Sequence, residues 1–221
     1  MKTSSFILDG LKAVIFDFDG TLASLNVDFE AMRSGVLDRI RSYGLPAQIF
    51  EGLFVLEMVR AAEQALSRSN PGRAQDFRNG ALDFIRSVEL DGAGKGAVFD
   101  GVPELLSRLR NTGLSTAVVT RNCRDAVTAV YPRITEDTDV VLTRDDVRRV
   151  KPHPRHIREA LERLGQEPGK AIMVGDHPMD IAAGKAAGTR AAGVLTGSSS
   201  REALTAAGSD VVFDRVTDLL P

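Results

Sequence analysis

Acidic side chains stand at the ends of short apolar runs in this 221-residue sequence. The run KAVIFD ends at Asp17, with Asp19 two residues later, and the run KAIMVGD ends at Asp176. Short apolar runs of this kind predict buried strands. The carboxyl ends of parallel strands meet at one edge of a sheet, so we expect these carboxylates to converge there. Asp180, four residues after Asp176, should join them.

Clustered carboxylates at such an edge repel one another unless a cation holds them. The predicted cluster of Asp17, Asp19, Asp176 and Asp180 therefore indicates a hard divalent ion with oxygen ligands, most simply Mg²⁺. Mn²⁺ and Co²⁺ offer similar oxygen coordination and remain alternatives to it.

A hydroxyl group and an ammonium group accompany the acids. Thr120 ends the apolar run LSTAVVT, and Lys151 lies in a loop just before a predicted helix. Together with Mg²⁺, these two side chains can neutralise charge on the oxygens of a phosphoryl group. A helix expected to start near Asn122 should direct free backbone N–H groups at the same place. The residues predicted to bind substrate are Gly20, Thr21, Thr120, Arg121, Asn122 and Lys151.

Asp17 and Asp19 are separated by one residue at a strand end, so their side chains should point the same way. A carboxylate close to the metal can attack phosphorus and form an acyl phosphate. A second carboxylic acid can protonate the leaving oxygen and then activate water. We predict that Asp17 is the nucleophile and Asp19 the acid and base, with Thr120 and Lys151 completing the catalytic set.

Strands alternate with helix-like stretches through most of the chain. Further apolar runs lie at 138–142 and, more weakly, at 189–194 and 210–213. VPELLSRLRNTG and HPRHIREALERLG have leucines at helical spacing and end in glycine, and Ser199 with Glu202 predicts a capping box. The alternation predicts an α/β fold with a doubly wound, mostly parallel, Rossmann-like sheet.

Residues 26–90 interrupt this alternation with apolar residues at helical spacing and no strand pattern. The segment ends in the glycine-rich sequence DGAGKG. We predict a small all-helical cap domain at 25–96, inserted after the first strand, and a catalytic core formed by 1–24 and 97–221. The apolar positions behind this prediction are Phe29, Met32, Val36, Ile40, Ile49, Leu53, Leu56, Phe77, Ala81, Phe84 and Val88.

The composition argues against several classes of partner. A net charge of −2 gives no general attraction for nucleic acid or acidic membranes, and no apolar segment is long enough to span a bilayer. Cys123 is the only cysteine, which is typical of a reducing compartment. The opening segment has no apolar stretch long enough for a signal peptide. We expect a cytoplasmic enzyme with a small-molecule substrate, as a monomer or a homodimer.

Four ordered motifs resemble those of the haloacid dehalogenase (HAD) superfamily. They are DFDGTL at 17–22, Thr120, Lys151-Pro152 and GDHPMD at 175–180. The resemblance extends over 12–215, with the helical insert in the position of that superfamily's first type of cap.

The resemblance implies roles for individual residues. Asp17 and Asp176 would ligate Mg²⁺ directly, and Asp19 would ligate it through its backbone carbonyl. Asp180 would either ligate the metal or orient Lys151 and metal-bound water. These two roles for Asp180 remain open.

The resemblance also narrows the chemistry. Dehalogenases of the superfamily lack the second acid, which is Asp19 here. Phosphonate-cleaving members also lack it and rely on a cap lysine; residues 25–90 contain no lysine, so this chemistry is excluded unless Lys95, at the hinge, substitutes. The chain most resembles the phosphoglycolate phosphatase-like group. That likeness implies a Mg²⁺-dependent phosphatase that hydrolyses a small phosphorylated metabolite, a phosphoglycolate-like monoester, through an aspartyl phosphate. A sugar phosphomutase of the same fold and a non-catalytic phosphate-ligand-binding protein are the alternatives.

Overall fold

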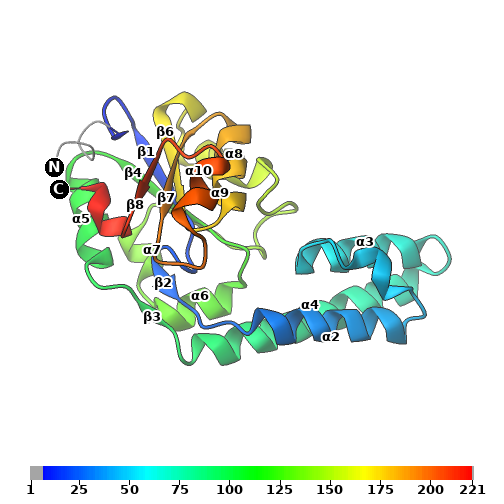
Figure 1. Cartoon of the computed structure of the whole chain (residues 1–221). Helices are drawn as coiled ribbons and strands as arrows, with labels where there is room; N and C mark the ends of the chain where they lie inside the picture. The colour runs from blue at the N-terminus through cyan, green and yellow to red at the C-terminus, as the bar shows by residue number, and fades with distance from the viewer. Residues whose placement is uncertain (1–6, 221) are drawn as a thin grey trace. The chain divides into compact units, whose positions relative to one another are not determined.

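The computed structural model describes residues 7–220 and divides them into two compact units. The helical unit is Asn26–Lys95, and the core unit comprises the described residues up to Leu25 and from Gly96 onward (Figure 1). The boundaries predicted from the sequence are 25 and 96. Each unit has its own hydrophobic core and is described separately.

A six-stranded sheet forms the centre of the core unit, in the order β5-β4-β1-β6-β7-β8 (Figure 1). Every pair of neighbouring strands is parallel, so the predicted doubly wound α/β fold is confirmed. The strand order reverses between β1 and β6, the point at which sheets of this kind bind ligands. The strands are β1 (Ala13–Phe16), β4 (Ser115–Val119), β5 (Val140–Leu142), β6 (Ala171–Gly175), β7 (Arg190–Val194) and β8 (Val211–Phe213).

Helices cover both faces of this sheet. On one face, α8 (Arg155–Leu164) contacts β4 and β5, and α9 (Pro178–Ala187) contacts β6 and β7. On the other face, α5 (Val102–Asn111) contacts β4 (Figure 1). All four residues of β1 are fully buried, as expected for a parallel strand enclosed between two layers of helices.

Shorter elements complete the core unit. The helix α10 (Arg201–Ala206) begins after Ser200, whose hydroxyl accepts a hydrogen bond from the Ala203 N–H at 3.2 Å. The capping box predicted at Ser199 is therefore wrong by one residue. The remaining short elements are β2 (Ala23–Ser24), β3 (Ala97–Val98), α6 (Arg124–Val130), α7 (Ile134–Asp137), η2 (Pro168–Lys170) and η3 (Val216–Leu219).

The helical unit consists of three α-helices and one short 3₁₀-helix. Asp28 and Asn70 cap α2 and α4 by accepting backbone N–H groups at 2.8 and 3.0 Å. The last helix continues through Ala93, so half of the glycine-rich DGAGKG segment is helical. The elements are α2 (Phe29–Ser42), η1 (Ala47–Phe50), α3 (Val55–Ser67) and α4 (Pro71–Ala93).

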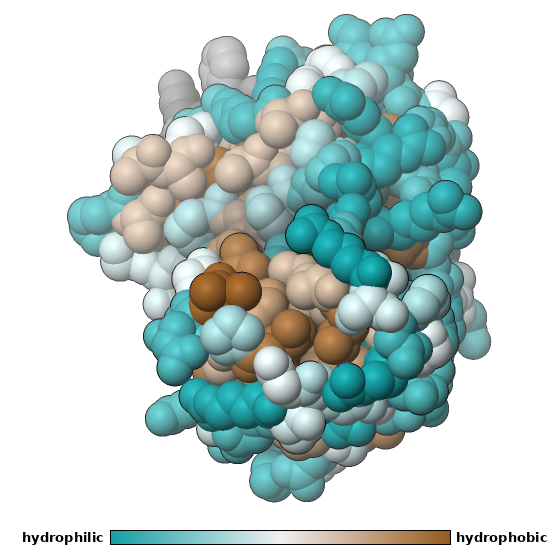
Figure 2. Space-filling view, turned by 90° about the vertical axis from the view of Figure 1, so that its right-hand side faces the viewer, coloured by the Kyte–Doolittle hydropathy of each residue, from teal (hydrophilic) through white to brown (hydrophobic). Residues whose placement is uncertain are grey.

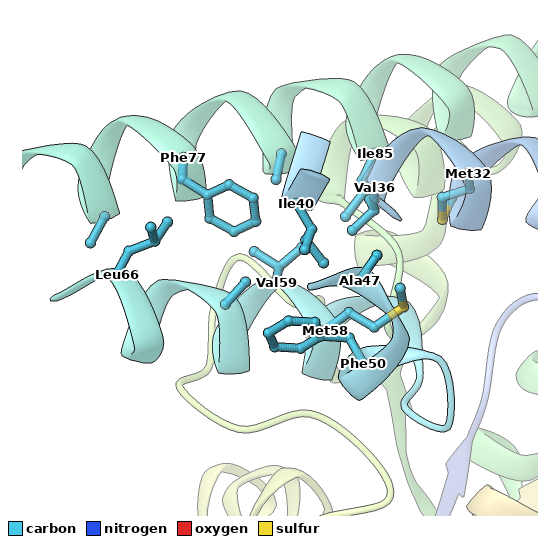
Figure 3. Close-up of a cluster of buried hydrophobic side chains, with 13 residues drawn as sticks. Met32, Val36, Ile40, Ala47, Phe50, Met58, Val59, Leu66, Phe77 and Ile85 are labelled. Carbon is cyan, nitrogen blue, oxygen red and sulfur yellow. The ribbon is translucent and has the colours of Figure 1, made fainter. Parts of the chain in front are cut away.

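The helices of this unit bury a continuous apolar cluster (Figure 3). Val36 and Ile40 of α2 lie in it, as the helical spacing of the sequence predicts, and Val59 of α3 lies in it as well. Phe77 of α4 is fully buried, and its ring meets Tyr43 edge-on, with ring centroids 5.2 Å apart. This edge-to-face contact adds to the energy gained by burying the Phe77 ring.

Three residues predicted to face this core are exposed instead. Phe29, Ile49 and Leu53 have exposed fractions of 60, 67 and 37%. The segment around Ile49 is a 3₁₀-helix and a turn, so the 3.6-residue spacing does not apply, and Ala47 and Phe50 are buried in its place. Figure 2 shows apolar side chains gathered on the face of this unit that is turned toward the viewer.

None of the helices within residues 7–220 is long and apolar enough to cross a membrane.

We expect Phe77→Ala to lower the free energy of unfolding by about 3–5 kcal/mol, because it removes a buried ring and leaves a cavity. Phe29→Ala is the matched control, since the exposed Phe29 should change stability by no more than about 0.5 kcal/mol. Urea unfolding of the full-length variants measures both. Equal effects of the two substitutions would contradict the packing described here.

Candidate active site

The ammonium group of Lys151 lies between two carboxylates at the carboxyl edge of the sheet. Its Nζ is 2.7 Å from Asp17 Oδ1 and 2.7 Å from Asp180 Oδ1, and the side chain is 1% exposed. Burial alone lowers a lysine pKa, but the charges of Asp17 and Asp180 outweigh burial and raise the pKa of Lys151. The lysine is therefore charged, with its position set by two ion pairs.

A third acid, Asp176, belongs to the same cluster. Asp17, Asp176 and Asp180 each place a carboxylate oxygen within 4.8 Å of the others. Burial and the charge of Asp180 raise the pKa of Asp17 well above its usual range, and the same two causes raise the pKa of Asp176 to about 7. One lysine does not neutralise three clustered carboxylates, two of which are buried. The donor set therefore fits a divalent cation that prefers oxygen ligands, such as Mg²⁺.

The register of the sheet brings these acids together. Asp17 follows β1 and Asp176 follows β6, and the two strands are adjacent. The backbone N–H of Asp17 continues their ladder by donating to the Val174 carbonyl at 2.9 Å. Thr120 follows β4, which is the neighbour of β1 on its other side. Three adjacent strands thus end in three of the residues that the sequence singled out.

Two loops pack tightly around Asp176. Thr21 is fully buried, and its hydroxyl donates to Asp176 Oδ1 at 3.3 Å. A Cβ atom on Gly20, which has φ +81°, would lie 2.6 Å from Asp176 Cγ, and one on Gly197 would overlap the carboxylate. The Thr196 hydroxyl holds the two loops together by donating to the Gly20 carbonyl at 2.6 Å. Side chains larger than hydrogen at these glycines would displace the carboxylate.

Asp17 and Asp19 lie in the tight turn after β1. The Phe18 N–H donates to Asp17 Oδ1 at 2.7 Å, and the Leu25 N–H donates to Asp19 Oδ1 at 2.8 Å. Burial raises the pKa of Asp19, although backbone hydrogen bonds from Leu25 and Gly20 and the charge of Lys151 oppose the shift. A carboxylic acid that keeps its proton more readily is suited to proton donation.

Thr120 and Asn122 bond to each other. The Thr120 hydroxyl donates to Asn122 Oδ1 at 2.8 Å, and the Asn122 N–H lies 3.2 Å from Thr120 Oγ1. The Arg124 N–H, at the start of α6, donates to Asp145 Oδ2 at 2.9 Å. The prediction of free N–H groups at this helix start is therefore wrong for Asn122 and Arg124, because each N–H donates to a side-chain oxygen.

Arg121 joins the loop after β4 to the loop that carries Lys151. Its guanidinium Nη1 donates to the Lys151 carbonyl, and Arg144 in turn donates to the Arg121 carbonyl at 3.3 Å. Two residues predicted separately as substrate-binding are thus connected through the backbone of Lys151.

Asp180 uses both carboxylate oxygens within the protein. Oδ1 pairs with Lys151, while Oδ2 accepts the His177 N–H at 3.1 Å. His177 Nδ1 accepts the Met179 N–H at 3.1 Å, so the two residues form a capping box at the start of α9. These contacts position Asp180 behind Lys151.

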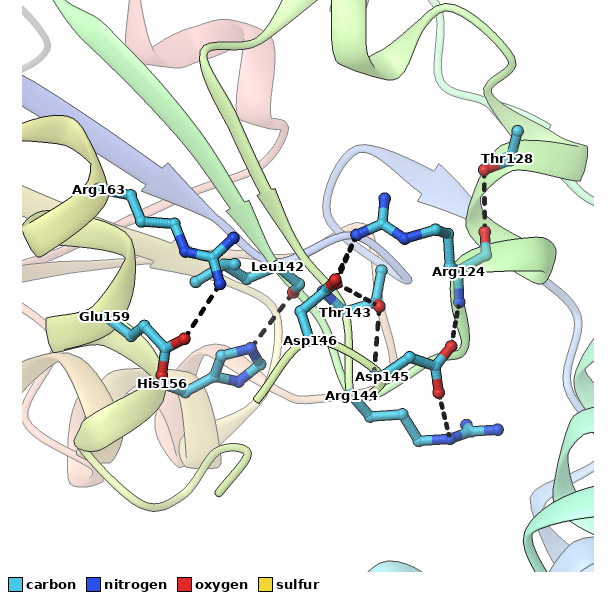
Figure 4. Close-up of polar contacts among 10 residues, drawn as sticks. All are labelled: Arg124, Thr128, Leu142, Thr143, Arg144, Asp145, Asp146, His156, Glu159 and Arg163. Carbon is cyan, nitrogen blue, oxygen red and sulfur yellow. Dashed lines mark hydrogen bonds and ion pairs between the residues drawn. The ribbon is translucent and has the colours of Figure 1, made fainter. Parts of the chain in front are cut away.

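Asp146 fixes the loop that follows β5 (Figure 4). Its carboxylate accepts Arg124 Nη2 at 2.6 Å and the Thr143 N–H and hydroxyl at 2.8 and 2.7 Å. Burial would raise the pKa of Asp146, but the hydrogen bonds from Arg124 and Thr143 outweigh it and lower that pKa. The loop is thereby attached to α6, whose first residue is Arg124.

The structure brings most of the residues predicted from the sequence to one place. Asp17, Asp176, Asp180 and Lys151 contact one another or lie within one cluster. Sequence reasoning missed Gly197 and its neighbour Thr196. No local pattern identifies them, because their contacts exist only when β7 lies beside β6 in the sheet.

Comparison with known proteins connects this geometry to a family. Residues 14–194 match the model of the haloacid dehalogenase-like hydrolases. The chain is 31% identical over 214 residues to the pyrophosphatase PpaX of Bacillus cereus (strain AH820), which covers 96% of this chain and 95% of that protein.

Solved structures resemble the fold at lower sequence identity. A hydrolase from Pseudomonas syringae has a TM-score of 0.69 at 20% identity, covering 94% of this chain and 95% of that one. A predicted phosphoglycolate phosphatase from Haemophilus somnus 129PT has a TM-score of 0.63 at 20% identity, with coverage of 95 and 96%. At this level of identity, these likenesses concern the fold alone.

We expect Gly197→Ala to weaken Mg²⁺ binding roughly 10- to 100-fold, because the added methyl group displaces the Asp176 carboxylate. Isothermal titration calorimetry of the full-length chain with Mg²⁺ measures this loss. Gly169→Ala is the matched control, since a methyl group there meets no atom within 4 Å. Equal Mg²⁺ affinities of the two variants would contradict the packing around Asp176.

We also expect Asp146→Asn to lower the free energy of unfolding at pH 7 by roughly 1–3 kcal/mol, since charge-assisted hydrogen bonds are lost. The pKa of Asp146 is lower in the folded protein, so this stabilisation is present above its ordinary value of 3.8. It disappears as the pH falls through the lower, folded value.

Urea unfolding at a series of pH values tests the sign of this dependence. The stabilities of wild type and Asp146→Asn should converge as the pH falls below about 4. The exposed Asp9 provides the control, because Asp9→Asn removes a carboxylate from the surface. A gap between wild type and Asp146→Asn that widens in acid would contradict the assignment.

Proposed function

The chain belongs to the haloacid dehalogenase-like hydrolase family and is a phosphatase-type enzyme, and from that premise we propose its mechanism, metal and substrate. We propose that it is a Mg²⁺-dependent phosphatase that hydrolyses a small phosphorylated metabolite through an aspartyl phosphate. The observation that carries the proposal is the Lys151 ammonium, 2.7 Å from both Asp17 and Asp180, beside a third buried acid. Such an arrangement can hold a phosphoryl group between an ammonium group and a metal.

The residues that would hold Mg²⁺ are the carboxylates of Asp17 and Asp176, with the backbone carbonyl of Asp19. The raised pKa values of Asp17 and Asp176 support this assignment, because a bound cation favours their ionised forms. When bound, the ion would supply positive charge that neutralises the negative charge on the oxygens of the transferring phosphoryl group. Asp180 fits the second of its two roles, because its oxygens already engage Lys151 and His177.

Asp17 is the member of the cluster best placed to attack. Its side chain is 14% exposed, compared with 2% for Asp180. Within residues 7–220, its hydrogen bond from Phe18 and its ion pair with Lys151 both fall on Oδ1. We assign the attack on phosphorus to Asp17 Oδ2 on these grounds.

The reaction then has two steps that share one acid. Asp17 forms a bond to phosphorus while the bond from phosphorus to the leaving oxygen breaks, and that oxygen takes a proton from Asp19. Water next attacks the phosphorus of the acyl phosphate and gives a proton to Asp19, and the bond between phosphorus and Asp17 breaks. Lys151 and the Thr120 hydroxyl contact the phosphoryl oxygens in both steps.

Two substrate classes follow from different observations. The sequence motifs favour a phosphoglycolate-like monoester. The relative that is 31% identical over nearly the whole chain is a pyrophosphatase, which supports inorganic pyrophosphate as the second candidate. Both substrates present a terminal phosphoryl group next to another anionic group. A sugar phosphomutase is less favoured, because all three histidines lie outside the helical unit.

The test is phosphate release from a panel containing pyrophosphate, phosphoglycolate, sugar phosphates and nucleoside monophosphates. We expect release to require Mg²⁺, to stop with chelator and to resume when Mg²⁺ is added back. The substrate with the highest kcat/KM identifies the class. Transfer to a sugar phosphate faster than transfer to water would indicate the phosphomutase, and tight ligand binding without any release would indicate the non-catalytic alternative.

We expect Asp17→Asn to lower kcat by about 1000-fold or more, because the amide cannot form the acyl phosphate. The matched control is Asp9→Asn, an exposed residue before β1 at the opposite edge of the sheet. A loss of less than about tenfold in Asp17→Asn would rule out Asp17 as nucleophile.

A further inference from the structure

One buried histidine lies behind the site and takes no part in the mechanism above. His156 is fully buried in the first turn of α8. Its Nδ1 lies 3.3 Å from the backbone N of Lys151. Its Nε2 lies 3.2 Å from the Leu142 carbonyl oxygen (Figure 4). A backbone N–H only donates and a carbonyl only accepts, so Nδ1 is unprotonated and Nε2 carries the hydrogen.

The surroundings of His156 favour this neutral form. Burial, together with the nearby Lys151 ammonium, lowers the pKa of His156 to about 3. A proton on Nδ1 would also face the Lys151 N–H and abolish that hydrogen bond. His156 is therefore a fixed acceptor on one side and a fixed donor on the other.

The two hydrogen bonds of His156 lead to both residues that would contact the phosphoryl group. The Leu142 carbonyl, at the end of β5, also accepts the Thr120 N–H at 3.0 Å. One imidazole thus connects the backbone of Lys151 to the backbone of Thr120 through a single shared carbonyl. The carbonyl of Lys151 accepts a hydrogen bond from the Arg121 guanidinium.

Lys151 needs such support because its charge is at the end of a long side chain. Burial of the ammonium is offset only while Nζ stays between Asp17 and Asp180. A shift of the Lys151 backbone moves Nζ away from both carboxylates. A misplacement of about 1 Å in such a site can cost about 100-fold in rate.

We propose that His156 is a positioning residue that holds Lys151 and Thr120 in register for phosphoryl transfer. The inference rests on the proposed function, since it assumes the roles assigned there to Lys151 and Thr120. The two hydrogen bonds of His156 are not equally important for this role. Without His156, the Leu142 carbonyl keeps the Thr120 N–H, whereas the Lys151 N–H loses the acceptor that fixes it.

Three substitutions separate the two hydrogen bonds. His156→Leu removes both, His156→Asn keeps an acceptor near the position of Nδ1, and His156→Gln can extend a donor towards the Leu142 carbonyl. We expect kcat to fall about 10- to 100-fold in the leucine variant. The asparagine variant should recover most of this loss and the glutamine variant less, with KM changing little in all three.

A destabilised control separates positioning from stability. Leu161→Ala empties a buried site on the same helix, α8, five residues after His156. Assayed well below the lowest unfolding midpoint, it should keep kcat within about twofold of wild type. Losses of kcat that follow the unfolding midpoints across all four variants would overturn the proposal, as would a His156→Leu enzyme within twofold of wild type.

Hydrogen exchange of the Lys151 backbone N–H, followed by NMR, tests the same contact without turnover. Exchange should be at least about tenfold faster in His156→Leu than in wild type or His156→Asn. Equal exchange rates would overturn the proposal, and so would faster exchange with unchanged kcat. A wild-type chain that releases no phosphate would overturn the proposed function instead, while the exchange rates still show whether His156 holds Lys151.

Discussion

The ion pairs of one buried ammonium group are the interaction on which the rest of this site depends. Burying the Lys151 ammonium costs desolvation free energy. That cost is offset only while Nζ contacts Asp17 and Asp180 at 2.7 Å. Its neighbours are arranged to keep it there. Arg121 binds its carbonyl, His156 faces its N–H, and the cap of α9 holds Asp180 behind it.

The same constraint gives three identical side chains three different environments. Asp180 has both oxygens engaged, one by Lys151 and one by a backbone N–H. Asp176 is enclosed by Thr21 and by two glycines that leave no room for a methyl group. Asp17 is the more open carboxylate, and its hydrogen bond from Phe18 and its ion pair with Lys151 share Oδ1. Differences in packing, rather than in residue type, therefore separate the proposed nucleophile from the acids beside it.

Local patterns predicted much of this architecture because most strands of the sheet are short apolar runs followed by a polar residue. The run before Asp17 and the run before Asp176 are β1 and β6, and their parallel pairing follows from the helices between them. The predictions fail where the local period changes. Ile49 and Leu53 lie in a 3₁₀-helix and a turn. An α-helical spacing therefore predicts that they face the core, whereas both are exposed.

The sequence by itself determined which acids and which hydroxyl follow the strands, and which lysine precedes a helix, because that depends only on residues a few positions apart. The tertiary structure alone decided how these groups contact one another. Thr196 reaches Gly20 across 176 residues, and Thr21 reaches Asp176 across 155. His156 meets Lys151 only through the turn that starts α8, and it meets Leu142 because α8 packs on β5. Contacts of this kind depend on the order and register of the strands, which no short segment of the chain encodes.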